Sequence, residues 1–382
     1  MGRRIRYFVL ISLLVATAVS AGWAQSQEDN GIIEDLKLFS KALGAISEAW
    51  VGDVTPRNLL YQAVKGMLGS LDKFSEFIEP ERFKLLQIHM RGEYAGIGAI
   101  LQIVNNQVGI RAVEPGKPAD KAGLRPGDII LKIDGISMEN KSVMDVSSLL
   151  RGEANTPVTL TVLREPRQIF DVKIERAKIE IQAVQDSRMI GKELAYLRLA
   201  EWQEHTASQT DTVLEGFKKQ GMKALIIDLR NNDGGLLTQA VALAERFLPK
   251  GKKIVSVQSK IPEQRKEYFV TQSPAYPKLT MVILVNEKSA SASEVFSAAM
   301  QEHRRATLVG VKTYGKGSVQ SVIPLDDVSA MKLTTARYAT PSGKVIDMIG
   351  LIPDRVVSNG TEGTPGSDRQ ILEAIAILKQ YM

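Results

Sequence analysis

Two segments in the second half of the chain each combine a buried strand, a turn and a helix. The first reads KALIIDL, RNNDGG and LLTQAVALAERFL, and the second reads LTMVILVN, EKSAS and ASEVFSAAMQEH. Their apolar runs are continuous rather than alternating, which is typical of strands buried on both faces. Such a sheet must be covered by helices on each side, so we predict an α/β core.

The stretch before this core reads as a compact β-rich module at residues 93–178. Ile97, Ala99, Leu101 and Ile103 occupy alternate positions, and the alternation resumes after the turn NNQ. IILKIDG and PVTLTVLR predict two more strands, and SVMDVSSLLR between them has helical spacing.

Helical segments flank these two parts. Residues 30–90 carry apolar side chains such as Ile33, Leu36 and Leu43 at helical spacing, and EPERFKLLQ places a proline at a helix start. Near the end, SNGTEGTPGS predicts a linker and DRQILEAIAILKQYM a last helix. The chain is therefore expected to be multidomain.

The first residues predict export from the cytoplasm. Arg3, Arg4 and Arg6 precede an uncharged run from Tyr7 onwards, and the small residues around Ala24 suit a signal peptidase. We predict a secretory signal that is cut after Ala24. The run is near the minimum of about 18 to 20 residues for a membrane span, so an uncleaved anchor is the alternative. In both cases the rest of the chain is expected to be periplasmic or otherwise extracytoplasmic.

Charge and composition exclude several functions. The chain has 382 residues and no cysteine, which excludes disulfides, thiolate metal sites and a cysteine nucleophile. Without the three arginines of the signal, its 49 basic residues become 46 against 43 acidic ones, and the charges are interspersed. Such a surface argues against nucleic acid as a partner.

The sequence SASASE at residues 289–294 raises the question of a nucleophilic serine. Helical spacing begins near Ser291, which places this serine at a strand-to-helix turn. The N–H groups at a helix N-terminus favour negative charge and suit the oxyanion of acyl transfer. Serine is also a favoured N-cap, so a purely structural role is the alternative.

A nucleophilic serine also needs a base. His303 lies about three turns along the helix that Ser291 begins, which is too far away for a hydrogen bond to this serine. A Ser–His–Asp arrangement that uses His89 or His205 is an open alternative. A lysine can replace histidine where burial lowers its pKa. Lys316 stands between two glycines ahead of an alternating segment, and Gln320 would share its face in a strand and orient the amine.

Several long motifs, in the family's order, resemble the carboxyl-terminal processing proteases, which are PDZ-containing serine–lysine peptidases also called tail-specific proteases. VNEKSASASEVFSAAMQEHRRATLVGVKTYGKGSVQ is similar to their active-site region, and GMKALIIDLRNNDGG to their glycine-rich strand and loop. ARYATPSGKVIDMIGLIPD is similar to their C-terminal core signature. EYAGIGAIL and PADKAGLRPGDIILKIDG are similar to their PDZ insert.

This resemblance implies a serine endopeptidase that cleaves proteins near their C-termini and needs no metal or cofactor. By similarity, Ser291 is expected to be the nucleophile, Lys316 the general base and Gln320 the residue that orients it. Ser289 and Ser293 would then have capping or packing roles.

The resemblance also implies an oxyanion hole and an architecture. The hole would combine the backbone N–H of Ala292 with that of Gly234 or Gly235. The fold would be multidomain α/β, with a crotonase/Clp-like α/β protease core, an inserted β-rich PDZ domain and flanking helices. The expected parts are a signal peptide at 1–24, an N-terminal helical segment at 25–92, the PDZ domain at 93–178, the serine protease core at 179–357, and a linker with a C-terminal helix at 358–382.

The PDZ domain is expected to select proteins or peptides with apolar, free C-termini. Such a peptide would add as a strand beside residues 96–101, with a helix from about Ser142 to Leu150 as the other wall. Backbone N–H groups of the YAGIG turn would hold its terminal carboxylate. The residues expected to bind it are Tyr94, Ala95, Gly96, Ile97 and Gly98. A PDZ fold used only for internal packing is the alternative.

Two features depart from the family pattern. Asp233 stands where the glycine-rich loop usually has a proline, which leaves the loop less preorganised and brings a carboxylate near the oxyanion site. LDKFSEFIEP also differs from the family's usual sequence at this place. It belongs to the helical N-terminal segment, so the difference bears on assembly rather than on chemistry. The family suggests a homodimer that forms through the terminal helices. The alternatives to an active protease are a catalytically silent PDZ scaffold and a latent protease that requires an activating adaptor protein.

Overall fold

The computed structural model describes residues 29–166, 168–326, 328–358 and 368–382. The predicted signal peptide and nearly all of the predicted linker lie outside the described residues. The chain divides into two compact units, Met1–Phe77 and Ile78–Met382. Among the described residues, no helix is both long and apolar enough to cross a membrane.

The first unit is helical where it is described, as the sequence predicted. It contains α2 (Asp29–Ala49) and α3 (Pro56–Gly69), and β1 (Glu76–Ile78) follows at its end. The α3 helix begins with a proline, and the side chain of its N-cap Thr55 accepts a hydrogen bond from Asn58 N–H at 3.3 Å.

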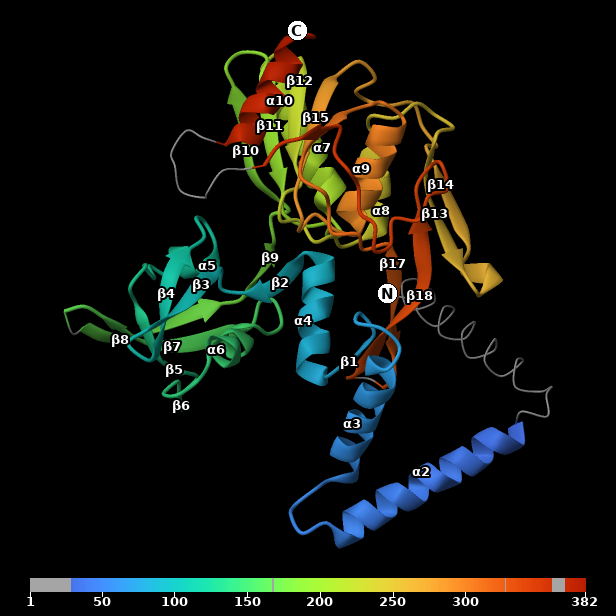
Figure 1. Cartoon of the computed structure of the whole chain (residues 1–382). Helices are drawn as coiled ribbons and strands as arrows, with labels where there is room; N and C mark the ends of the chain where they lie inside the picture. Colours follow the sequence, from blue (N-terminus) through green and yellow to red (C-terminus); the bar gives the residue numbers. More distant parts are fainter. Residues whose placement is uncertain (1–28, 167, 327, 359–367) are drawn as a thin grey trace, which may run out of the picture. The chain divides into compact units, whose positions relative to one another are not determined.

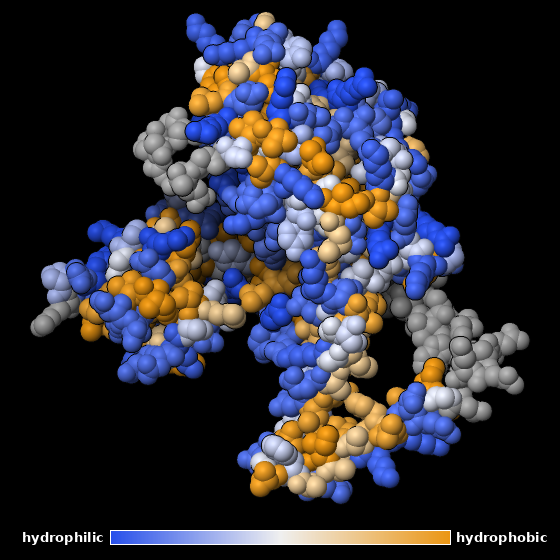
Figure 2. Space-filling view, viewed as in Figure 1, coloured by the Kyte–Doolittle hydropathy of each residue, from blue (hydrophilic) through white to orange (hydrophobic). Residues whose placement is uncertain are grey.

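Apolar side chains remain exposed along α2. Ile33 and Leu36, two of the side chains that predicted this helix, are more than half exposed, while Leu43 is partly buried. Figure 2 shows such apolar side chains on the visible face of α2. The helical periodicity therefore predicted the helix but not the burial of its apolar residues.

The β-rich module has one main sheet and two helices (Figure 1). The sheet order is β3 (Ala99–Val104), β4 (Gln107–Val113), β5 (Ile129–Ile133), β7 (Pro157–Arg164) and β8 (Gln168–Glu175), with β6 (Ile136–Ser137) beside β5. Its helices are α5 (Pro118–Lys121) and α6 (Val143–Leu150). The antiparallel pair of β2 (Glu93–Gly96) and β9 (Ala177–Glu180) begins and ends the module.

The alternation predicted for the first strand of this module is only partly correct. Its β3 pairs with β4, and the register shifts between Ile100 and Leu101. The extra residue is Arg111 in β4, so the alternation of β3 itself is unbroken, and Ala99 and Leu101 both pack on the core of the module. Ile103, one residue before the end of β3, is nevertheless 54% exposed, so the alternation did not predict its burial.

The core sheet is mostly parallel and has helices on both faces, as the continuous apolar strands predicted (Figure 1). Its order is β10 (Val184–Ile190), β11 (Leu194–Leu199), β12 (Ala224–Asp228), β15 (Thr280–Val285), β16 (Thr307–Gly310) and β19 (Arg355–Val356). Only β10 runs antiparallel to its neighbour among these described strands. The helices are α7 (Thr206–Lys219), α8 (Leu237–Ala244), α9 (Ala292–Glu302) and α10 (Arg369–Lys379).

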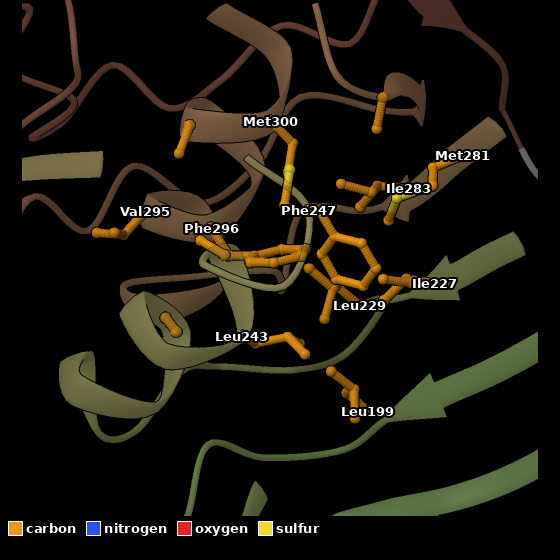
Figure 3. Close-up of a cluster of buried hydrophobic side chains, with 14 of the residues drawn as sticks. Leu199, Ile227, Leu229, Leu243, Phe247, Met281, Ile283, Val295, Phe296 and Met300 are labelled. Carbon is orange, nitrogen blue, oxygen red and sulfur yellow. The ribbon is translucent and has the colours of Figure 1, made fainter. Parts of the chain in front are cut away.

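Alternate residues of the central strands fill two different cores. Ile227 of β12 and Ile283 of β15 pack with α8 and α9, where Figure 3 shows them near Phe247 and Phe296. The intervening side chains of the same strands pack on the opposite face, against α10. Each fully buried Leu, Ile or Phe contributes about 1.5 to 3 kcal/mol, so these two layers hold the strand ends rigidly.

A second, antiparallel sheet lies beside α9. It contains β14 (Lys266–Phe269), β13 (Lys253–Ser259), β18 (Ala330–Ala339) and β17 (Ser318–Pro324) in that order, with the short η1 (Pro262–Gln264) between β13 and β14. The helix α4 (Pro80–Arg91) begins with the proline that predicted it and buries Phe83 against β17 and β18.

Gly310 allows β16 to pair closely with β15, and it generates a prediction about stability. Its φ is +140°, and a Cβ there would lie 1.9 Å from the carbonyl oxygen of Val285. We expect Gly310→Ala to destabilise the core by about 4 kcal/mol or more, because backbone must shift. Gly343 is the matched control, since its φ is also positive but a Cβ would meet nothing within 4 Å.

Gly343→Ala should therefore lower the free energy of unfolding only by the strain of an alanine in the left-handed conformation, about 1 to 2 kcal/mol. Urea unfolding of the two variants measures the difference. Equal midpoints for both proteins would contradict the close packing assigned to Gly310.

Candidate active site

The predicted catalytic residues come from loops at one edge of the core sheet. The strands β12, β15 and β16 are parallel neighbours, so their carboxyl ends meet. Gly234 follows β12, Ser291 follows β15 and Lys316 follows β16. Ligands of open α/β sheets bind outside the carboxyl ends of the strands. The topology therefore brings together three segments that are distant in sequence.

Ser291 occupies a strained turn at the start of α9. It is the N-cap residue, with φ 55° and ψ −115°. A non-glycine residue at such angles carries about 1 to 3 kcal/mol of strain, which must be held by its surroundings. The side chain is 8% exposed. This turn presents the Ser291 hydroxyl at the sheet edge, as predicted from the strand–turn–helix pattern.

The other two serines of SASASE are fully buried and hold the backbone. Ser289 Oγ donates to the carbonyl oxygen of Leu229 at 2.8 Å and accepts from Asn286 N–H at 2.9 Å. Ser293 Oγ donates to the carbonyl oxygen of Asn232 at 3.0 Å. Their hydroxyls thus join the serine loop to the loop after β12, in agreement with the packing roles expected of them.

The loop after β12 is organised by Asn232. This side chain is fully buried; its Nδ2 donates to the carbonyl of Leu199 at 3.0 Å, and its Oδ1 accepts from Gly234 N–H at 3.0 Å. Its carbonyl oxygen also accepts from Ala290 N–H at 3.0 Å. Gly234 fits only because it lacks a side chain, since a Cβ would lie 2.8 Å from that of Ser291.

These bonds distinguish the two glycines that the sequence left as alternatives for the oxyanion hole. The Gly234 N–H is occupied by Asn232, whereas the N–H groups of Gly235 and Ala292 have no hydrogen-bond partner within the described residues. The geometry therefore favours Gly235 as the second donor. Asp233 is exposed, so water screens the carboxylate that was expected to weaken the site.

Arg230 anchors the start of this loop. It pairs with buried Asp228 at 2.6 Å and with Asp368, the N-cap of α10, at 2.7 Å. Burial alone would lower the pKa of Arg230, but the hydrogen bonds and charges of Asp228 and Asp368 raise it. The guanidinium is thus permanently charged and links the C-terminal helix to the glycine-rich loop.

Glu294 joins the serine loop to the lysine loop, and the sequence reasoning missed it. This fully buried carboxylate accepts from Ser291 N–H at 2.9 Å and from Lys316 N–H at 2.8 Å, both on Oε2. Its Oε1 accepts from Thr313 Oγ1 at 2.6 Å and Gly315 N–H at 2.8 Å. The S-x-x-E spacing of a capping box, present in SASE, was the available signal.

Lys316 is half-buried, and the argument that placed Gln320 beside it is wrong. A shared strand face was predicted for the two, but β17 begins only at Ser318, after Lys316. The register of β17 also shifts between Val319 and Gln320. The extra residue at that shift is Thr335 in β18, so β17 keeps its own alternation. Because Lys316 precedes the strand, a spacing of four residues does not place its side chain on the face of Gln320.

Gln320 and Ser291 have other partners in this structure. The Gln320 amide donates to Ser318 Oγ at 2.8 Å and to Thr334 Oγ1 at 3.3 Å. Catalytic hydrogen bonds are often long without substrate and tighten in the complex, so the dyad stays a prediction.

Tyr338 is a contact of Ser291 that the sequence did not indicate. Its phenol lies beside the side chain of Ser291, and its backbone N–H donates to the carbonyl of Gly317 at 2.7 Å. Burial raises the pKa of Tyr338 to about 12, and the nearby Ser291 side chain lowers this pKa in part. The neutral phenol therefore bridges the serine and the residue after Lys316.

The three histidines contact other groups, which answers the open alternative for the base. His89 Nε2 lies 3.1 Å from Glu201, and His205 Nε2 lies 3.7 Å from Glu93. His303 Nε2 lies 2.7 Å from the carbonyl oxygen of Lys253. None of them hydrogen-bonds Ser291 in this structure, so a Ser–His–Asp arrangement has no support.

The residues predicted to bind a peptide line a narrow cavity of about 130 Å³ in the β-rich module. Four of them, Tyr94, Gly96, Ile97 and Gly98, face Ser147, Leu150 and Arg151 at the end of α6. The fifth, Ala95, lines a neighbouring cavity of about 750 Å³ between α4 and α6. The N–H groups of Ile97 and Gly98 have no partner within the described residues, and β3 has an unpaired edge beside them.

No group of three or more histidine, aspartate or glutamate residues that could hold an ion occurs in the parts that the structure describes.

Two family profiles and several known proteins match this chain. The profile of peptidase family S41 matches residues 193–357, and that of a PDZ domain matches residues 109–164. A carboxy-terminal-processing protease of Bartonella bacilliformis is 34% identical over 361 residues, which cover 93% of this chain and 82% of the relative. A carboxyl-terminal-processing protease of Synechocystis sp. is 31% identical, covering 99% of this chain and 95% of the relative. A photosystem II D1 C-terminal processing protease superposes with a TM-score of 0.49 at 29% identity, covering 88% of this chain and 96% of that one.

The four hydrogen bonds of Glu294 generate a prediction about turnover. In Glu294→Gln one oxygen becomes an NH₂ group, which cannot accept, so two buried donors lose their partner. Each such donor costs about 1 to 3 kcal/mol, and the serine and lysine loops lose their common anchor. We expect kcat to fall at least about tenfold and the melting temperature to fall by several degrees.

Glu302→Gln is the matched control, because Glu302 ends the same helix and accepts from Thr340 and Ser342. It should lower the melting temperature and leave kcat per folded molecule near the wild-type value. If both variants keep wild-type kcat, the positioning role of Glu294 is wrong.

Proposed function

Because the chain belongs to peptidase family S41, as a serine-type carboxyl-terminal processing protease with a PDZ domain, we propose that it cleaves extracytoplasmic proteins with a Ser291–Lys316 dyad. The observation that carries the dyad is Glu294 Oε2, which accepts from the backbone N–H groups of both residues. Two candidate catalytic residues from different loops are thereby adjacent.

In the proposed reaction, the neutral amine of Lys316 takes the proton of the Ser291 hydroxyl. The hydroxyl oxygen attacks the scissile carbonyl, and the oxyanion accepts hydrogen bonds from the N–H groups of Ala292 and Gly235. Such donors at a preorganised site are worth about 100-fold to 1,000-fold each in rate. Lys316 then protonates the leaving amine, and water hydrolyses the acyl-enzyme through the same base.

The proximity of Tyr338 to Ser291 favours a second candidate, a latent form of the same protease in which the phenol engages the serine hydroxyl. The Ser291 hydroxyl must exchange Tyr338 for Lys316 before its proton can be taken. A bound substrate or an adaptor protein that shifts β18 would favour that exchange. A catalytically silent scaffold has weaker support, since Asp233, its motivating feature, points its charge into solvent.

We further propose that the PDZ domain binds the C-terminal end of the substrate. The unpaired edge of β3 offers main-chain hydrogen bonds to an added strand, and the N–H groups of Ile97 and Gly98 suit its carboxylate. Leu150 supplies an apolar contact in the same cavity. The positively charged and then apolar segment from Arg3 to Ala24 supports the export that this role requires.

The dyad predicts the effect of two single substitutions. Ser291→Ala and Lys316→Ala should each lower turnover of an unfolded reporter protein at least about a thousandfold, because the nucleophile or its base is lost. Lys312→Ala is the control, since this exposed lysine lies in the same loop. A fluorophosphonate probe should label the wild type and leave Ser291→Ala unlabelled. Substantial turnover by purified Lys316→Ala would exclude the lysine as base.

The proposed carboxylate site predicts a preference for free C-termini. Amidation of the C-terminus of a cleaved peptide should raise KM about tenfold or more, because hydrogen bonds to a charged group are lost. Acetylation of the N-terminus of the same peptide is the control and should leave KM unchanged. Steady-state kinetics on the three peptides decide the matter, and equal KM values would remove the support for this role of the PDZ domain.

A further inference from the structure

Trp202 lies beneath the proposed oxyanion hole, in the segment between β11 and α7. It is 1% exposed and pairs with Gly235 as a short parallel bridge. Its N–H donates to the carbonyl of Gly234 at 3.1 Å, and its carbonyl accepts from Leu236 N–H at 2.7 Å. The glycine-rich loop is thereby held as one extended strand along Trp202.

This bridge sets the direction of the Gly235 N–H. In a parallel bridge one residue bonds the two neighbours of its partner, so the partner's own N–H points to the opposite side. A Cβ at Gly235 would lie 2.2 Å from the carbonyl oxygen of Trp202, so the two main chains are in close contact. Gly235 therefore presents its N–H away from Trp202, on the side left open for a ligand.

The indole of Trp202 holds the other half of the hole. Its Nε1–H donates to Ser293 Oγ at 2.9 Å, and Ser293 in turn donates to the carbonyl of Asn232 at 3.0 Å. Ser293 follows Ala292 directly at the start of α9. The ring also packs on Phe296, one turn along, with centroids 5.5 Å apart. Trp202 thus contacts the helix that carries the first donor through its side chain and the loop that carries the second through its main chain.

We propose that Trp202 is a positioning residue that sets the separation of the Ala292 and Gly235 N–H groups, an inference that rests on the proposed peptidase function. Two donors from different segments must both lie about 2.7 to 3.1 Å from a single oxyanion. Gly234 and Gly235 have φ values of +113° and +136°, where glycine is free to vary, so the loop needs external support. Trp202 supplies that support through main-chain and side-chain bonds at once.

The test compares Trp202→Phe, Ser293→Ala and the double variant with wild type. Phenylalanine keeps an aromatic ring beside Phe296 but has no N–H for Ser293. Trp50→Phe is the matched control, because Trp50 is 61% exposed and lies in the first unit. The measurements are kcat and KM per site titrated with fluorophosphonate, the Ki of a peptide aldehyde that forms a tetrahedral adduct, and the Kd of the cleaved product peptide.

We expect Trp202→Phe to lower kcat about tenfold and to raise the aldehyde Ki by the same factor. KM and product binding should stay within twofold, because neither needs the oxyanion donors. Ser293→Ala removes the same hydrogen bond and also the bond to the Asn232 carbonyl, so it should lower kcat at least as much. The double variant should lose no more than Ser293→Ala alone, because the Trp202–Ser293 bond can be lost only once. Ser293→Ala also keeps the test decisive if Trp202→Phe does not fold.

Wild-type kcat in both single variants would overturn the role of Trp202, as would equal losses in aldehyde and product affinity, which indicate a merely structural effect. Ser291→Ala in the same assay separates the two hypotheses. Cleavage by Ser291→Ala at the wild-type rate would overturn the proposed function and this inference together. Cleavage by wild type alone, with unchanged Trp202→Phe and Ser293→Ala, would overturn only the inference.

Discussion

The chemistry of this site depends on a single buried carboxylate. Glu294 has no solvent exposure, so its charge is tolerated only because four hydrogen bonds reach its two oxygens. Those donors come from the serine turn and from the loop of Lys316. The requirement that a buried charge be satisfied thus brings two loops of separate strands together. The strained φ of Ser291 is stable for the same reason, since its N–H is one of the four donors.

Elements with strong local patterns were predictable, and contacts between distant segments were not. Continuous apolar runs predicted β12, β15 and the helices after them, because burial on both faces leaves no polar position in a strand. The position of Ser291 at a strand-to-helix turn followed from the same pattern, whereas its role as nucleophile is a prediction from family resemblance. Gln320 could not be placed relative to Lys316, because the point at which β17 begins depends on its pairing with β18 rather than on its own sequence.

The choice between Gly234 and Gly235 shows the same limit more sharply. Both glycines have positive φ, and nothing in RNNDGG distinguishes them. The distinction arises because Asn232 turns its side chain back onto the Gly234 N–H and bonds Leu199 in the neighbouring strand. A side chain that satisfies one donor leaves the next one available. Function at this loop is therefore decided by which backbone groups the protein satisfies internally.

The residues that follow Trp202 contact the segment that leads into the PDZ domain. Trp202 faces the glycine-rich loop, while Gln203 packs against Gly92, where a Cβ would lie 2.8 Å from its Oε1. Glu204 N–H donates to the carbonyl of Met90, in the last turn of α4, at 3.1 Å. Gly92 leads directly into β2, which begins the PDZ module. Because consecutive residues of one extended segment contact the junction and the glycine-rich loop, neither can shift by much without moving the other. The proposed peptide site and the proposed oxyanion hole therefore share a stretch of main chain.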